Sequence, residues 1–359
     1  MNKDDLIYIA GHRGLVGSAI RRLLEERGFQ RMLTRTHAEL DLTRQEQVER
    51  FFETQRPAYV FLAAARVGGI GVNASLPAQF IYDNLAIALN VIHSAWRFGV
   101  RRLLNLGSSC IYPKLAPQPL KEEYLLTGPL EPTNEAYAVA KISALKLCRH
   151  YNKQYGTKFF SLMPTNLYGP NDNFDFASSH VLPALIRKLH IARLLHAGDF
   201  NSIRRDLSHW SRATAVDSET ERQIVAILEA QGISSGRVTV WGTGAPLREF
   251  LHVNDLAEAC LLLIEGTHVP ETDDFVNVGT GKDITVADLA RMIREVVGYD
   301  GEVVFDTTKP DGTPRKLLDV SRILQRGWRP KISLKEGIAR TYQWYLETTR
   351  AEKVEKGSG

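Results

Sequence analysis

The feature that most constrains the fold is a glycine-rich turn near the N-terminus. Leu6–Ala10 is a continuous apolar run, Gly11-His-Arg-Gly14-Leu-Val-Gly17 follows it, and Ser18–Arg27 carries apolar residues at helical spacing. This order predicts a buried strand, a tight turn and an amphipathic helix. Glycines there let backbone amides approach a pyrophosphate at the start of the helix. A turn that serves only the strand-to-helix corner is the alternative, but the flanking strand and helix favour dinucleotide binding.

Further apolar runs indicate that strands and helices alternate through the first half of the chain. The predicted strands cover residues 31–34, 59–64, 102–106 and 159–163, and segments with helical periodicity separate them. Continuous apolar strands alternating with amphipathic helices are typical of a parallel sheet that is covered on both faces. We therefore predict an α/β fold with a doubly wound parallel sheet.

The pattern changes after Tyr168-Gly-Pro170, where Asn, Asp and Ser become frequent and the next strand is expected only at Arg237–Trp241. We predict a first domain over residues 1–169, with 242–265 as a candidate segment that returns to it. Residues 170–350 are expected to form mainly a second, smaller α/β domain that binds substrate. It includes a helical insertion at about 191–235, in which Glu219–Gln231 has one apolar face. Residues 351–359 are treated as a tail.

Composition and charge exclude several classes of function. The 359 residues carry a net charge of +4, with basic and acidic residues interspersed, which gives no case for a nucleic-acid partner. No apolar stretch approaches the roughly 18 residues that cross a bilayer, so neither membrane insertion nor secretion is expected. Cys110, Cys148 and Cys260 lie far apart, which predicts no disulfide framework, no metal site and a cytoplasmic protein. Cys148 and Cys260 fall in apolar helical patterns and are interpreted as packing residues.

The end of the second predicted strand indicates the cofactor. NAD sites place an Asp or Glu there, but this chain has Thr34-Arg35-Thr36-His37. Arg35, together with Arg13 in the glycine turn, would attract a 2′-phosphate and so favours NADP(H). The alternative is that both arginines are simply solvated. Asp41 and Leu42 are expected near the adenine.

A tyrosine and a lysine four residues apart form the candidate catalytic pair. Tyr137 and Lys141 share one face of a predicted helix, where the ammonium can lower the pKa of the phenol and make it a proton donor to a carbonyl oxygen. This spacing also occurs by chance. Its position after Leu106-Gly-Ser108-Ser-Cys110, at the end of a buried strand, is the stronger signal, and Ser108 could donate to the same oxygen.

These motifs and several others resemble those of the extended short-chain dehydrogenase/reductases and, within them, of the GDP-L-fucose synthases. The matching stretches span nearly the whole chain and cover residues 11–17, 63–70, 107–114, 130–135, 164–170, 248–253 and 309–316. The resemblance implies a Rossmann sheet and NADPH-dependent 3,5-epimerisation and 4-reduction of GDP-4-keto-6-deoxy-D-mannose. It also implies a homodimer joined through Asn84–Phe98 and Ala138–Gln154.

The resemblance assigns roles to individual residues. Cys110 would be the base and His180 the acid of epimerisation, beside Ser108, Tyr137 and Lys141; a small core cysteine and a surface histidine are the alternatives. Lys188 stands where relatives carry arginine. The implied cofactor contacts are Gly11, His12, Arg13, Gly14, Leu15, Val16, Gly17, Arg35, His37, Asp41, Leu42, Ala63, Ala64, Ala65, Leu106, Gly107, Lys141, Pro164, Asn166, Leu167 and His180. The implied substrate contacts are Ser108, Lys188, Trp241, Arg248, Asp311 and Lys316.

The main departure from the family pattern is the insertion at 191–235, beside the expected substrate pocket. It could be a lid, an added oligomer contact or a neutral elaboration. The accepted sugar could therefore be a related GDP-4-keto sugar, such as a dideoxy or heptose derivative. A nucleotide-sugar 4-epimerase or dehydratase is a further alternative, which Cys110 and Arg35 disfavour. Retention of Ser108, Tyr137 and Lys141 disfavours a non-catalytic regulator.

Overall fold

The computed structural model describes residues 1–210, 219–266 and 275–350, and the chain divides into two compact units. The first unit contains residues 1–167, 249–282 and 317–331, and the second contains 168–248, 283–316 and the chain from 332 onward. The chain therefore returns to the first unit twice, whereas the sequence suggested one returning segment at 242–265. The predicted tail at 351–359 lies outside the described residues.

The first unit is built on a six-stranded sheet in the order β2-β1-β3-β4-β5-β9. All neighbouring strands are parallel, and Ile7 of β1 is paired with Met32 on one side and Tyr59 on the other. This confirms the predicted doubly wound sheet. The strands are β1 (Ile7–Ala10), β2 (Met32–Leu33), β3 (Tyr59–Leu62), β4 (Arg102–Leu106), β5 (Phe159–Pro164) and β9 (Phe275–Val278).

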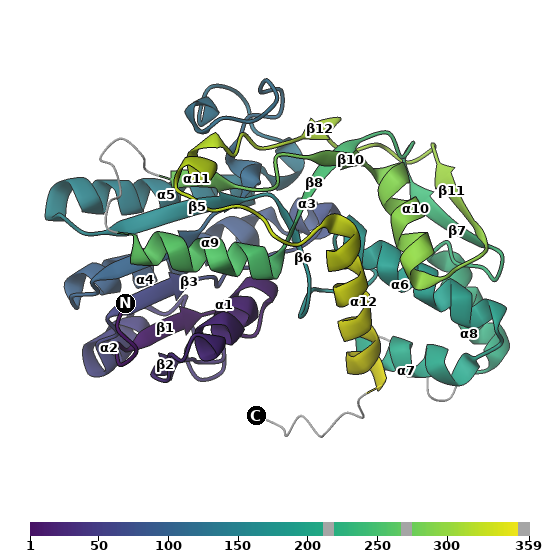
Figure 1. Ribbon diagram of the computed structural model, residues 1–359, viewed down its shortest axis with the longest axis horizontal. Helices are drawn as coiled ribbons and strands as arrows, with labels where there is room; N and C mark the ends of the chain where they lie inside the picture. Colours follow the sequence, from purple (N-terminus) through teal and green to yellow (C-terminus); the bar gives the residue numbers. More distant parts are fainter. Residues whose placement is uncertain (211–218, 267–274, 351–359) are drawn as a thin grey trace. The chain divides into compact units, whose positions relative to one another are not determined.

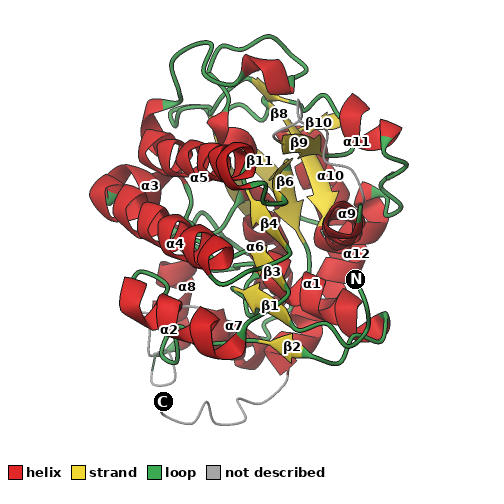
Figure 2. Ribbon diagram, turned by 90° about the vertical axis from the view of Figure 1, so that its left-hand side faces the viewer, coloured by secondary structure: helices red, strands yellow, loops and turns green. Residues whose placement is uncertain are grey.

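Helices cover both faces of this sheet (Figure 2). One face packs against α1 (Leu15–Glu26), α9 (Val253–Glu265) and α11 (Ser321–Gln325), and the other against α2 (Gln45–Gln55), α4 (Pro77–Arg97) and α5 (Glu135–Tyr155). Strand β1 shows why its run is continuously apolar: Ile7 and Ile9 face one hydrophobic cluster, whereas Tyr8 and Ala10 face the other. Cys260 and Cys148 are fully buried in these two clusters, one in each.

Short elements complete the first unit. They are α3 (Ile70–Ser75) and the 3₁₀ turns at Ser109–Ile111, Glu122–Tyr124 and Pro132–Asn134. Helix α5 ends at Gly156, which adopts the left-handed conformation with φ of 67° and so closes the helix without steric strain. The strands β1, β3, β4 and β5 all end at the same edge of the parallel sheet, which is the edge where ligands bind in doubly wound folds.

The second unit is mostly helical, as Figure 1 shows. Its helices are α6 (Val181–His196), α7 (Phe200–Trp210), α8 (Glu221–Ala230), α10 (Val286–Val297) and α12 (Leu334–Arg350). Strands β7 (Arg237–Trp241) and β11 (Glu302–Asp306) form a parallel pair. A four-stranded sheet contains β10 (Asp283–Thr285), β12 (Arg315–Lys316), β8 (Leu247–His252) and β6 (Asn166–Tyr168), the last two of which cross the boundary between the units.

The predicted insertion at 191–235 is mostly helical where it is described. Residues 191–196 continue α6, and α7 and α8 follow, with 211–218 outside the described residues. Thr220 begins α8 with a reciprocal cap, because its side chain accepts from the backbone of Gln223 while the Gln223 side chain accepts from the backbone of Thr220. Ile224 and Leu228 form its buried face, so the amphipathic pattern at Glu219–Gln231 is explained by packing.

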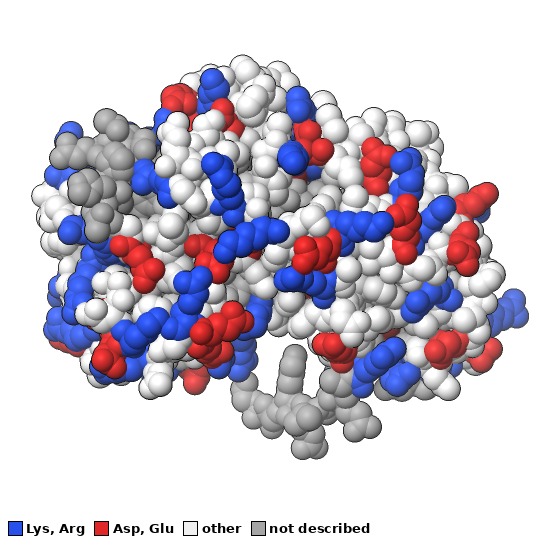
Figure 3. All heavy atoms as spheres, in the orientation of Figure 1, with Lys and Arg blue, Asp and Glu red and all other residues white. Residues whose placement is uncertain are grey.

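The distribution of charged side chains over the surface and the hydropathy of the helices can both be described. On the face shown in Figure 3, acidic and basic side chains are interspersed. Among the described residues, no helix is both long enough and apolar enough to span a membrane.

Candidate functional site

The glycine turn between β1 and α1 requires glycine at positions 11 and 17. Gly11 has φ of +86°, and a Cβ there would lie 2.8 Å from the backbone nitrogen of Ala64. A Cβ on Gly17 would lie 2.2 Å from the carbonyl oxygen of Gly11. Gly14 is the N-cap of α1 and has no side chain that could bond to the first-turn amides. These amides therefore remain available to an anion.

A hollow of about 310 Å³ opens beside this turn. Arg13 and Arg35 lie in its wall, and the guanidinium of Arg35 is oriented by a 2.7 Å bond to the carbonyl of Thr34. The Nδ1 atom of His12 is buried and has no hydrogen-bond partner among the described residues. The pKa of His12 is lowered by burial and by Arg13, so a neutral ring faces the hollow. The full lining is Gly11, His12, Arg13, Gly14, Arg35, Thr36 and His37.

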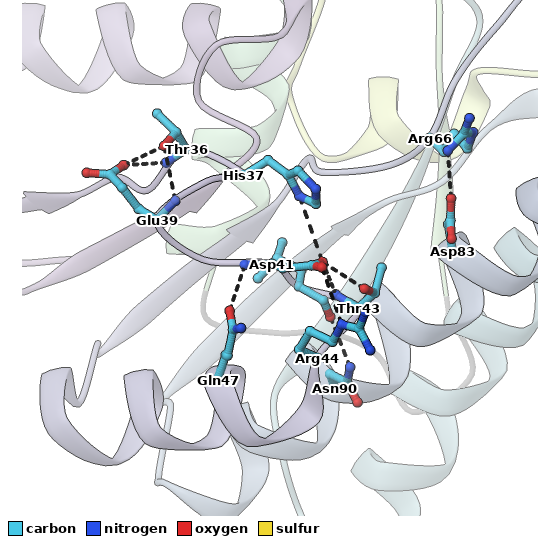
Figure 4. Close-up of polar contacts among 11 residues, drawn as sticks. Thr36, His37, Glu39, Asp41, Thr43, Arg44, Gln47, Arg66, Asp83 and Asn90 are labelled. Atoms are coloured by element: carbon cyan, nitrogen blue, oxygen red, sulfur yellow. Dashed lines mark hydrogen bonds and ion pairs between the residues drawn. The ribbon is translucent and has the colours of Figure 1, made fainter. Parts of the chain in front are cut away.

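This hollow has the chemistry that the phosphates of NADP(H) require. It combines a glycine cradle, two guanidinium groups and an unsatisfied imidazole nitrogen, and anionic phosphates bind such donors. Glu39 lies near but accepts bonds of 2.7 and 2.8 Å from the backbone and hydroxyl of Thr36 (Figure 4). Its carboxylate is thus occupied locally, and the residues present fit the predicted cofactor.

Asp41 and Leu42, predicted to lie near the adenine, belong to the segment that leads into α2. Figure 4 shows the carboxylate of Asp41 among His37, Thr43 and Arg44. It accepts bonds of 2.9 and 2.7 Å from the backbone and hydroxyl of Thr43, and these bonds lower its pKa although burial acts in the opposite direction. The side chain of Asn90 donates to the carbonyl of Leu42 at 2.9 Å. The visible role of these contacts is to fix the loop backbone.

The predicted catalytic residues of the first unit lie together at the carboxyl end of β4. Lys141 donates from Nζ to the carbonyl of Leu106 at 2.8 Å, and its Nζ is 5.7 Å from the centre of the Tyr137 ring. The hydroxyl of Ser108 accepts from the backbone of Cys110 at 3.2 Å and interacts with the Tyr137 phenol. Gly107 permits this arrangement, because a Cβ there would lie 2.1 Å from the sulfur of Met163.

Burial dominates the electrostatics of this cluster. It lowers the pKa of Lys141 to about 8. The pKa of Tyr137 is raised, first by burial and then by Cys110, and the bond to Ser108 offsets part of this rise. The sequence argument expected the ammonium to lower the phenol pKa, but the direction found is the opposite because desolvation disfavours the phenolate. Tyr137 therefore keeps its proton near neutral pH and can donate it.

A buried hydrogen-bond network behind this cluster was not predicted. The Tyr112 hydroxyl donates to Oδ1 of Asn277 at 2.6 Å, and the Asn277 side chain donates to the carbonyl of Leu120 at 2.9 Å. The backbone of Asn277 donates to Glu122 at 3.0 Å. The sequence indicated this network only through the position of Tyr112, two residues after Cys110. Asn277 is too distant in sequence for its pairing with Tyr112 to be inferred.

The remaining predicted cofactor contacts line the same edge of the sheet. Ala63–Ala65 follow β3 beside Gly11, Pro164 is the last residue of β5, and Asn166 and Leu167 begin β6. The Asn166 side chain donates to the carbonyl of Glu249 at 2.7 Å. Among the described residues no group of His, Cys, Asp and Glu has metal-binding geometry.

The predicted residues of the second unit are linked by successive contacts. Lys188 donates to the carbonyl of Thr239 at 3.4 Å, two residues before Trp241, whose side chain is 69% exposed. The Asp311 carboxylate accepts two bonds from Thr243, of 2.9 and 2.7 Å, and interacts electrostatically with Arg248.

Lys316 completes this set. It is paired in register with Arg248 and interacts electrostatically with His180, which is exposed at the start of α6. Burial lowers the pKa of both Lys188 and Arg248. The structure thus brings Lys188, Trp241, Arg248, Asp311, Lys316 and His180 into one group within the second unit, and Ser108, Cys110, Tyr137 and Lys141 into another within the first.

Comparison with known proteins identifies similar chains. The model of the NAD dependent epimerase/dehydratase family matches residues 7–211 and 207–279. The chain is 51% identical to GDP-L-fucose synthase 1 of Arabidopsis thaliana, over 96% of this chain and 94% of that protein. It is 50% identical to GDP-L-fucose synthase of Escherichia coli, over 95% and 96% respectively.

Among solved structures, one similar protein is a GDP-D-glycero-L-gluco-heptose synthase from Campylobacter jejuni, determined in the presence of NADPH. The TM-score is 0.90 with 40% sequence identity, and the match covers 96% of this chain and 99% of that one.

Proposed function

The chain belongs to the NAD dependent epimerase/dehydratase family and, within it, to the GDP-L-fucose synthases, and on this premise we propose how its residues act. The reaction is the NADPH-dependent 3,5-epimerisation and 4-reduction of GDP-4-keto-6-deoxy-D-mannose to GDP-L-fucose. The observation that carries the proposal is the position of Cys110 on the same turn as Ser108, whose hydroxyl interacts with Tyr137, while the buried Lys141 lies 5.7 Å from the Tyr137 ring centre.

Epimerisation requires a base and an acid on opposite faces of the sugar. The Cys110 sulfur takes the proton from the carbon next to the ketone, and the electrons of that C–H bond form an enolate at the C4 oxygen. Ser108 and Tyr137 donate hydrogen bonds to this oxygen and stabilise its charge. His180 returns a proton to the carbon from the other face, and the same steps serve C3 and C5.

Reduction uses the same donors. When bound, NADPH supplies the hydride for C4. Tyr137 gives its proton to the C4 oxygen, for which it is suited because its raised pKa keeps it protonated. The glycine turn, Arg13 and Arg35 would hold the cofactor phosphates, and Lys141 would hold a ribose hydroxyl and support the phenol.

The GDP end of the substrate would bind the group in the second unit. The exposed Trp241 ring offers a wall for the base, and Lys309 lies 5.6 Å from its centre. Lys188, Arg248 and Lys316 supply charge for the phosphates. Lys188 in place of arginine keeps this charge but removes a bidentate contact.

A GDP-4-keto heptose is the second candidate substrate. It is favoured by the heptose synthase from C. jejuni, which has a TM-score of 0.90 to this chain. Parallel assays with the 6-deoxyhexose and the heptose derivative, each at several concentrations, distinguish the two. We expect the larger kcat/KM with the 6-deoxyhexose; a larger value with the heptose would replace the first substrate by the second.

We also infer a homodimer formed through α4 and α5. These helices pack together, and Trp96 stacks on Tyr155 with ring centres 4.2 Å apart. Tyr82 and Leu89 are 66% and 50% exposed on α4, which is costly for large apolar groups unless a partner covers them. Leu89→Glu should give a monomer in analytical ultracentrifugation; an unchanged mass would exclude this interface.

Three free cysteines fit a cytoplasmic location.

The role of Cys110 can be tested separately from cofactor binding. Cys110→Ser should abolish deuterium uptake at C3 and C5 in heavy water while the Kd for NADPH stays unchanged. Cys148→Ala is the matched control, because this fully buried thiol lies in the helical core. Deuterium uptake at the wild-type rate in the Cys110 variant would refute the assignment of the base.

A further inference from the structure

The predicted insertion at 191–235 supplies a buried charge to the second unit through helix α7. Asp206 on α7 is fully buried and accepts a 2.8 Å bond from Nε of Arg187 on α6, which is also fully buried. The hydroxyl of Tyr345 on α12 also contacts this carboxylate. A guanidinium removed from water requires a carboxylate partner, and α7, which packs against α6 and α12, provides it (Figure 1).

Arg187 also holds the loop that precedes α6. Its Nη1 donates to the carbonyl of Phe174 at 3.0 Å, and its guanidinium lies 3.9 Å from the centre of the Phe176 ring. Phe174 is itself fully buried, with ring centres 4.9 Å from Trp210 and 4.8 Å from Tyr345. Trp210 belongs to α7, so the segment reaches this loop both through the ion pair and by direct packing.

The loop transmits this anchoring to His180. The Asp175 carboxylate accepts bonds of 3.1 Å from the backbones of Ala177 and Ser178, and Asn173 Oδ1 accepts one of 3.1 Å from the backbone of Asp175. These bonds make residues 173–178 a compact turn. His180 is the N-cap of α6 and is separated from this turn by Ser179 alone, whose backbone donates to the carbonyl of Asp175 at 2.9 Å.

We propose that Asp206 and Arg187 are positioning residues for His180: Asp206 holds Arg187, and Arg187 holds the loop that places the imidazole. The inference rests on the proposed function, in which His180 returns the proton during epimerisation. Helix α7, which belongs to the predicted insertion, then completes the core that supports this loop.

Asp206→Asn is the first test, because it keeps the shape of the side chain and removes its charge. The readout is the ratio of fully epimerised to unepimerised reduced sugar, measured by NMR of the products. We expect this ratio to fall about 10- to 100-fold, as for a displaced reacting group. Backbone amides of residues 173–180 should exchange faster in the protein without substrate. A wild-type ratio would overturn the proposal.

Arg193→Met is the matched control on the same helix. Arg193 donates to the carbonyl of Val297 at 3.0 Å and does not contact the loop through this bond. Its removal should lower the Tm without changing the product ratio. A ratio that falls equally in both variants would mean that any loss of stability shifts the products, and this result would also overturn the proposal.

A double variant separates positioning from stability. Arg187→Leu with Asp206→Leu replaces a buried ion pair by apolar side chains, an exchange that commonly preserves or raises stability. The carbonyl of Phe174 and the hydroxyl of Tyr345 lose their partners, so we expect a Tm no lower than that of Asp206→Asn together with a low product ratio. A wild-type Tm together with a wild-type product ratio would show that Arg187 and Asp206 have only a structural role, and this would overturn the proposal. If His180→Asn keeps the wild-type product ratio, the role of His180 in the proposed function fails. If the product ratio changes in His180→Asn but stays at the wild-type value in Asp206→Asn, only the positioning role of Asp206 and Arg187 is overturned.

Discussion

The hydroxyl of Tyr112 donates a 2.6 Å hydrogen bond to Oδ1 of Asn277, and this bond joins the turn that carries Ser108 and Cys110 to strand β9. Tyr112→Phe removes the donor and leaves a fully buried amide oxygen without this partner. The free energy of unfolding should fall by about 1–3 kcal/mol, measured by urea denaturation. Tyr155→Phe, at an exposed tyrosine, is the control. Equal midpoints for Tyr112→Phe and wild type would contradict the importance of the bond.

Lys141 should make stability depend on alkaline pH. Its pKa is about 8 in the folded protein, whereas an unfolded chain keeps the ordinary value of about 10.4. Between these values the unfolded chain binds more protons, so the free energy of unfolding rises as pH rises. The gain is about 3 kcal/mol at most. Lys141→Met should lose it, which urea denaturation of the cofactor-free proteins at about pH 7.5 and pH 10 can measure; the same pH slope in both proteins would contradict the low pKa.

Arg35 should determine the preference for NADPH over NADH. Arg35→Ser removes a guanidinium from the wall of the hollow, so the Kd for NADPH should rise about 10- to 100-fold, the worth of a charge-assisted hydrogen bond. The Kd for NADH should change little. Fluorescence titration measures both values, with Arg31→Ser as the control because Arg31 is exposed and donates to the backbone carbonyl of Asp4 at 3.1 Å. Equal losses for the two cofactors would exclude a 2′-phosphate contact.

Glu249 forms hydrogen bonds with residues that lie close to the boundaries between the two units in the sequence. Its carboxylate accepts from the backbones of Gly281 at 2.7 Å and Leu318 at 3.0 Å, and its carbonyl accepts from the Asn166 side chain at 2.7 Å. Residues 166, 249, 281 and 318 each lie within two residues of a unit boundary.

Glu249→Gln turns one acceptor oxygen into a donor that faces a backbone N–H. The free energy of unfolding should fall by about 1–3 kcal/mol, since a buried donor is left unsatisfied. Glu258→Gln is the control, because it weakens a surface ion pair with Arg27 and should cost less than about 1 kcal/mol. Equal losses for the two variants would contradict the bonding described for Glu249.

Local patterns predicted the sheet and the cofactor edge because they depend on residues close in sequence. The run Leu6–Ala10 is apolar at every position since β1 is buried on both faces, and Gly11 and Gly17 are required by contacts within the same turn. Tyr137 and Lys141 share a helix face, so their proximity also followed from spacing.

Features that depend on distant contacts were not predictable in this way. The pairing of Tyr112 with Asn277, the ion pair between Arg187 and Asp206, and the second return of the chain at 317–331 join residues whose proximity the fold alone creates. The prediction that Lys141 lowers the pKa of Tyr137 was also wrong, because the spacing indicates the neighbouring ammonium but not the extent of burial, which raises this pKa.

The most direct test of the central claim is NADPH oxidation with GDP-4-keto-6-deoxy-D-mannose in heavy water, followed by NMR of the product. The account predicts consumption of NADPH and a GDP-L-fucose product with deuterium at both C3 and C5. A reduced product without deuterium at these carbons, or the absence of NADPH consumption while the cofactor binds, would contradict it.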